Sequence, residues 1–169
     1  PHDDVEVGEA PHARGMMGQF TEQGVVVRRA ESGDALISEI REATTARHTQ
    51  LLADPPADPS APAPGVFGAI GWTTGLLLRN RPLDVWMHEQ DVRRATGRSG
   101  NLDSPAAQHT ADQLLESMPY VLARRLGAGP GTSVMFVVEG SAPVTAVVDE
   151  GGRGVLVAEA PASPTVRIE

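Results

Sequence analysis

The chain has 169 residues, of which 40% are hydrophobic and 21% charged, and this composition is typical of a soluble globular protein large enough for one core or for a bundle with a small appendage. Its formal net charge is −8, and it has no basic cluster longer than a pair of arginines, so we expect no binding to nucleic acid. Because it contains no cysteine, disulfides, thiolate metal ligands and a thiol nucleophile of its own are excluded.

The first part of the chain predicts two helices that follow an acidic arm. Residues 1–12 lack apolar periodicity, which favours a surface segment. A helix is predicted over 13–30, although its glycines weaken it. Ser32 offers an N-cap for a second helix that extends to about residue 52. The proline-rich range 54–65 then predicts a stiff surface connection.

The next helix is expected over residues 79–95, with Pro82 either opening it or kinking it. Asp84, His88 and Asp91 follow one another at i, i+4 and i+7, so a helix projects all three from one side. Apolar residues flank this stripe, so the acidic and imidazole groups occupy the middle of an apolar face. The flanking residues are Leu83, Met87, Val85 and Val92. We expect Glu89, Gln90 and Arg93, on the opposite side, to face solvent.

The stripe has a metal-binding interpretation and a plainer one. A carboxylate that faces a core is costly unless it is paired, hydrogen-bonded or bound to a cation. Asp84 and His88, one helical turn apart, can converge on one divalent ion. They can equally form an ordinary Asp–His pair, or a polar patch with Arg79 and Arg81. Imidazole nitrogen with carboxylate oxygen suits zinc, with nickel, iron and manganese left open.

The second part of the chain predicts a last helix and then strands. Thr96-Gly97 ends the preceding helix, and Ser104-Pro105 restarts the chain as an N-cap and first helical residue. Pro119 should bend this helix, which carries a broad apolar face. That face consists of Leu114, Leu115, Met118, Val121, Leu122 and Leu126.

Alternating apolar residues predict three strands over 133–139, 143–149 and 154–159, and another extended segment over 165–169. We interpret them as a small antiparallel β meander, which must lean on the helices because so few strands have little core of their own. The predicted fold is therefore α+β, with a helical bundle over residues 1–130 and a small β-rich domain over 131–169.

The stretch from Leu76 to Ala95 also resembles the signature helix of the mycothiol-dependent maleylpyruvate isomerase family, through Leu76-Leu77-Leu78-Arg79, Arg81 and Asp84-Val85-Trp86-Met87-His88-Glu89-Gln90-Asp91-Val92-Arg93-Arg94-Ala95. The resemblance extends to residues 14–20, 97–98 and 100–107. Members of this family are DinB-like metal-binding helical bundles. The resemblance implies a four-helix bundle followed by a small α/β domain, in agreement with the elements above.

The resemblance also implies a site. In the family, a divalent metal, usually zinc, is held by an early His and by an acid–His pair, which corresponds here to Asp84 and His88. We expect Asp91 to orient a ligand or to pair with an arginine, and Arg79 and Arg81 are candidates for binding substrate carboxylates. The early His and the end of the family's C-terminal domain have no counterpart. Either the chain is a piece of a longer protein or these elements are lost, with His2 and His12 as substitute ligands.

The family reaction gives the expected function. Metal-bound mycothiol loses its thiol proton, and the thiolate adds to the cis double bond of maleylpyruvate, which allows rotation and elimination to fumarylpyruvate. We therefore expect the complete protein to be a mycothiol-dependent isomerase or S-transferase that acts on a small electrophile. The alternative is a non-catalytic metal- or ligand-binding bundle, or a degenerate family member.

The expected location is the cytoplasm. No apolar run approaches the roughly 18 residues of a membrane span, and no signal peptide is recognisable. The lack of lysine and the abundance of Ala, Gly and Pro suggest a gene of high G+C content, as in actinobacteria. The oligomeric state is left open.

Overall fold

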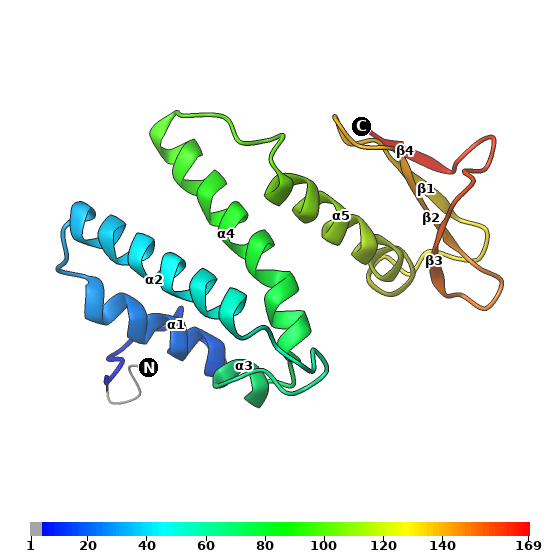
Figure 1. Ribbon diagram of the computed structural model, residues 1–169. Coiled ribbons are helices and arrows are strands. Elements are labelled where there is room, and N and C mark those ends of the chain that lie inside the picture. The colour runs from blue at the N-terminus through cyan, green and yellow to red at the C-terminus, as the bar shows by residue number, and fades with distance from the viewer. Residues whose placement is uncertain (1–4) are drawn as a thin grey trace. The chain divides into compact units, whose positions relative to one another are not determined.

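The computed structural model describes residues 5–169 and has an α+β fold, as predicted (Figure 1). His2 and the rest of the predicted arm's first four residues lie outside the described residues. The chain divides into two compact units, residues 1–78 and 79–169. This division lies inside a helix, whereas the sequence pattern placed a domain boundary after residue 130. The domain limits 1–130 and 131–169 stay a prediction.

The first unit contains the two predicted helices, α1 (Gly15–Arg28) and α2 (Gly33–Ala53), and a short helix α3 (Val66–Ala69). Ser32 is the N-cap of α2, since its side chain accepts a hydrogen bond of 3.2 Å from the amide of Ala35. Aromatic contacts join α1 to α3 and to the residues that follow it. The ring centroids of Phe20 and Phe67 lie 6.2 Å apart, and those of Phe67 and Trp72 lie 5.5 Å apart.

The signature stretch lies in helix α4 (Thr74–Thr96), which begins earlier than predicted and runs through Pro82. Proline has no amide proton, so its nitrogen cannot donate to the carbonyl of Leu78. One residue later, the carbonyl oxygen of Arg79 accepts a hydrogen bond of 2.7 Å from His109 Nε2. His109 thus has a structural role, because it satisfies a carbonyl in the turn that precedes Pro82.

The second unit continues from α4 into α5 (Pro105–Tyr120), a π-helical turn η1 (Val121–Arg125) and a four-stranded sheet. The strands are β1 (Ser133–Phe136), β2 (Val144–Val148), β3 (Gly154–Val157) and β4 (Val166–Ile168), in the order β3-β2-β1-β4. Ser104 caps α5, and Pro105 stands in its first turn, as the sequence predicted. Pro119 lies inside α5, one residue before its end.

The predicted antiparallel meander accounts for three strands, but the whole sheet is mixed. β1–β2 and β2–β3 are antiparallel, whereas β4 pairs in parallel with β1, with Val166 opposite Val134. Both edges of β2 are occupied, so a fourth strand can join only at β1 or β3. Hydrogen bonds between Ser133 and Thr165 hold β4 at the β1 edge. The side-chain oxygen of each residue accepts a hydrogen bond from the backbone amide of the other, at 3.0 and 3.1 Å. A hydrophobic pattern does not specify this choice of edge.

The core of the second unit lies between the sheet and the end of α5. It consists of Leu122, Val134, Ala146 and Val148, all at most 6% exposed. The last three are apolar residues of the alternating ranges 133–139 and 143–149 from which strands were predicted. Gly154 allows the close packing of β3 on α5, because a Cβ there would lie only 2.0 Å from the carbonyl oxygen of Pro119.

Gly154→Ala should therefore destabilise the second unit. The added methyl group must displace backbone, and overpacking of this kind costs about 1–3 kcal/mol. Thermal unfolding followed by circular dichroism should show a lower midpoint for this variant. Gly129→Ala is the matched control, because a Cβ at Gly129 meets no atom within 4 Å. Equal midpoints for the two variants would contradict the close packing of β3 on α5.

Candidate functional site

Five charged or ionisable side chains form a row along α4, and the predicted site residues lie in its middle. Arg81 pairs with Asp84 Oδ2 at 3.3 Å, and Asp84 Oδ1 lies 3.8 Å from His88 Nε2. His88 Nδ1 lies 3.7 Å from Asp91 Oδ2, and the other oxygen of Asp91 lies 3.6 Å from Arg94. The spacings of three and four residues produce this row, because such side chains are neighbours on a helix surface.

His88 presents a different nitrogen to each carboxylate. Its Nε2 faces Asp84 and its Nδ1 faces Asp91. A metal ion bound to Nε2 would therefore lie beside Asp84, on the side of the ring away from Asp91. Accordingly, no group of three His, Cys, Asp or Glu side chains within residues 5–169 is arranged to hold a metal ion. Asp84 and His88 could together supply two ligands, and Asp91 Oδ2 lies near Nδ1 but beyond hydrogen-bond distance.

Within residues 79–169 the row does not face a packed core, in contrast to the sequence-based expectation. The side chain of His88 is 76% exposed and that of Asp84 is 37% exposed. The flanking apolar residues Val85 and Val92 are each 63% exposed. Helical periodicity identifies residues that share a face, but it cannot identify which face the rest of the chain covers.

The side of α4 that was expected to face solvent is the one that holds the following loop. Trp86 Nε1 donates to the carbonyl of Asn101 at 2.8 Å, and Asn101 Nδ2 donates to Glu89 Oε2 at 2.6 Å. Glu89 Oε1 also accepts from Arg93 at 2.7 Å. Gln90 is only 7% exposed and donates to the carbonyl of Gly100. Glu89, Gln90 and Arg93 therefore anchor the loop. The expected exposure was wrong for Gln90, whereas Glu89 and Arg93 are half-buried.

These contacts hold Asn101 in a left-handed conformation, with φ at 60°. Asparagine tolerates this region better than most residues, and two bonds from α4 fix it there. The hydrogen bond from Arg93, together with that from Asn101 and the positive charge of Arg93, lowers the pKa of Glu89 below the usual value of a glutamate. Glu89 is therefore ionised in the anchored loop at neutral pH.

The two arginines proposed for substrate carboxylates have carboxylate partners within the protein. Arg79 forms an ion pair with Glu116 on α5, and this hydrogen bond raises the pKa of Arg79. Arg81 pairs with Asp84. Their role in substrate binding stays a prediction, and the structure places only Arg81 beside one of the two predicted metal ligands.

His12, which was considered as a substitute metal ligand, has a partner in the first unit. His12 Nε2 donates to Glu22 Oε2 at 3.0 Å, and Arg29 donates to the other oxygen at 2.9 Å. Glu22 is 6% exposed, so these two cationic or polar partners offset the cost of burying its carboxylate. Sequence patterning missed Glu22, because one acidic residue in a glycine-rich helix carries no signal of burial.

A model of a known protein family matches the part of the chain that includes most of the row. The model described as the mycothiol maleylpyruvate isomerase N-terminal domain matches residues 1–93, more than half of the chain. The chain belongs to this family. No curated protein and no solved structure is similar enough to count as a match.

The match to the mycothiol maleylpyruvate isomerase N-terminal domain includes Arg79, Arg81, Asp84, His88 and Asp91, and it ends two residues after Asp91. α5 and the sheet lie outside it. The predicted family and the helical character of its domain are thus confirmed. Over residues 5–169, the helices are too short or too polar for any of them to cross a membrane.

The anchoring role of Glu89 predicts a pH-dependent contribution to stability. Because folding lowers its pKa, Glu89 stabilises the native state above its unfolded pKa, and this contribution is lost as the pH falls through the lower folded value. Glu89→Gln should therefore lower the denaturant midpoint at pH 7, and the difference from the parent should shrink by about pH 3.

Glu42→Gln is the matched control for this measurement, because Glu42 is an exposed carboxylate on α2. Its midpoint should follow the parent at both pH values. If the two variants behave alike at pH 7, Glu89 does not anchor the loop.

Proposed function

We propose that this mycothiol maleylpyruvate isomerase family member binds one divalent metal ion, zinc in the first place, through Asp84 and His88. In this proposal the site activates the thiol of mycothiol for addition to a small electrophile. The observation that carries the proposal is the placement of His88, whose Nε2 faces Asp84 while its Nδ1 faces Asp91. The family match over these residues supports the same assignment.

The donor set fits such an ion in its chemistry. Imidazole nitrogen and carboxylate oxygen are common zinc ligands, and a metal-bound histidine typically donates its second ring proton to a carboxylate. Asp91 Oδ2 lies 3.7 Å from His88 Nδ1, so this bond requires a small movement of the two exposed side chains. The fit covers two ligands, whereas a catalytic zinc site commonly has three from the protein. A catalytic site of this kind therefore needs a third ligand from the protein besides Asp84 and His88.

The chain's own residues have distinct tasks in this mechanism. A divalent ion in such a site lowers the pKa of a coordinating thiol. Once moved into hydrogen-bond distance, Asp91 would accept the Nδ1 proton of His88 and leave Nε2 free to bind the ion. Arg81 binds one oxygen of Asp84 and leaves the other directed toward His88. The guanidinium groups of Arg81 and Arg79 supply positive charge for an electrophile that carries carboxylates.

The proposed reaction is thiol addition to an electrophilic double bond, followed either by cis–trans isomerisation and elimination or by retention of the thiol as a conjugate. The family name favours maleylpyruvate as the electrophile. In both outcomes the thiol comes from the cofactor, which agrees with the absence of cysteine from the chain.

The exposed position of the row supports a second candidate, a non-catalytic metal- or ligand-binding member of the family. With two exposed ligands, metal affinity is low, and ion pairs between exposed side chains contribute only about 0–1 kcal/mol. In this alternative the row is a chain of surface ion pairs on an otherwise folded helix. Stoichiometric zinc with mycothiol-dependent turnover favours the enzyme, whereas a folded protein without either favours the binding module.

His88→Ala should remove most of the bound zinc from the complete protein and abolish thiol-dependent turnover, because the remaining aspartate cannot hold the ion alone. The fold should be retained, since His88 is exposed. Elemental analysis of the purified protein and a mycothiol-dependent isomerisation assay provide the two measurements.

His48→Ala is the matched control, because it removes an exposed histidine from α2. It should keep both zinc and turnover. If His88→Ala retains stoichiometric zinc, or if His48→Ala loses it equally, the metal does not bind at this row.

A further inference from the structure

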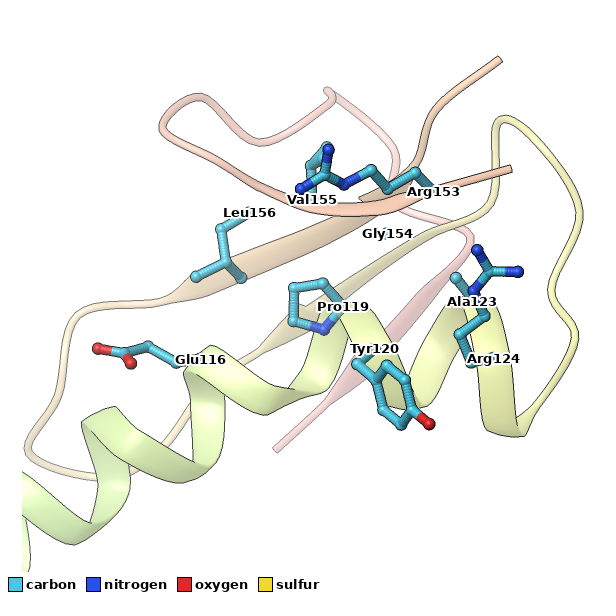
Figure 2. A pocket seen from close by; sticks show the side chains of 9 residues that line it. All are labelled: Glu116, Pro119, Tyr120, Ala123, Arg124, Arg153, Gly154, Val155 and Leu156. Carbon is cyan, nitrogen blue, oxygen red and sulfur yellow. The ribbon is translucent and has the colours of Figure 1, made fainter. Parts of the chain in front are cut away.

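An open pocket of about 560 Å³ lies between the end of α5 and strand β3, outside the range of the family match. Figure 2 shows Pro119 and the side chain of Arg124 on the helical side, and Arg153, Val155 and Leu156 on the strand side. The pocket is therefore formed by two segments that are about thirty residues apart in the sequence.

The side chains of the two arginines that line this pocket have no acidic partner in the described part of the chain. Within residues 5–169, the guanidinium groups of Arg124 and Arg153 form no ion pair, although acidic residues outnumber arginines by 22 to 14. Glu116, the acidic residue of the pocket, is paired with Arg79. The pocket therefore has a net positive charge in a protein whose formal net charge is −8.

A neighbouring arginine adds to this charge. The guanidinium of Arg125 lies 5.9 Å from the centroid of the Tyr120 ring, and that ring also belongs to the pocket. Arg124 and Arg125 end a helical segment, where cations interact favourably with the helix dipole. The dipole does not explain Arg153, which belongs to the turn before β3. Gly154 lets β3 approach Pro119 closely, so Arg124 and Arg153 line the same pocket, one on its helical side and one on its strand side.

The remaining surface of the pocket is apolar. Pro119, Ala123, Val155 and Leu156 contribute to it, and Leu156 is 43% exposed. Guanidinium groups bind carboxylates and phosphates by parallel hydrogen bonds, while an apolar wall favours a hydrocarbon or aromatic body. A ligand that satisfies both features is a small organic oxyanion.

We propose that this pocket binds a small organic anion, with its carboxylate or phosphate on Arg124 and Arg153 and its apolar part against Pro119, Val155 and Leu156. The site is separate from the Asp84–His88 row, which lies on α4. Its ligand does not need the metal proposed there.

Titration of the isotope-labelled protein, followed by the backbone amide NMR signals, tests this proposal. The probes are benzoate, phenyl phosphate and the uncharged benzamide. Saturable shifts of the amides of residues 153–156 are expected with benzoate, phenyl phosphate or both, and not with benzamide at the same concentrations. The two anions distinguish a carboxylate from a phosphate site.

Arg124→Gln and Arg153→Gln should each weaken binding of the anion by about fivefold, as expected for a charged hydrogen bond in an open site. Arg41→Gln removes an exposed arginine from α2 and should bind as the parent does. The proposal is overturned if neither anion shifts these amides, if benzamide binds equally well, if Arg41→Gln weakens binding as much, or if either pocket variant keeps the parent affinity.

Discussion

Helix α4 can turn only one side toward the rest of its unit, and the hydrogen bonds of Trp86 and Glu89 to Asn101 determine which side that is. They attach the loop after α4 to the face that carries Gln90 and Arg93. The row from Arg81 to Arg94 is consequently left on an exposed face. The accessibility of the proposed metal site thus depends on a few bonds on the opposite side of the same helix.

The sequence predicted those elements that rest on local chemistry. Ser32 and Ser104 cap the helices that they were expected to cap, and the alternation of Val134, Ala146 and Val148 identified the buried face of the sheet. The failures are long-range. The exposed face of α4, the burial of Glu22 and the parallel pairing of β4 depend on segments that meet only in the folded chain.

For the candidate site, the sequence predicted residues but not their surroundings. The spacing of Asp84, His88 and Asp91 placed them in one row, and the family match covers all three. The pocket between α5 and β3 gave no such signal, because Arg124 and Arg153 belong to different elements and to no recognisable motif. Both residues line one pocket because the backbone of β3 packs closely on Pro119 at Gly154. The two proposed sites therefore rest on different kinds of evidence.

The ring nitrogens of His88 offer the most direct test of the metal assignment. Nitrogen-15 NMR of the histidine rings in the complete protein, recorded with and without one equivalent of zinc, distinguishes a metal-bound nitrogen from a protonated one. The account predicts that zinc changes the Nε2 signal of His88 to that of a bound nitrogen, while Nδ1 keeps its proton toward Asp91. An unchanged His88 ring in the zinc-loaded protein, or zinc bound through Nδ1, would contradict it.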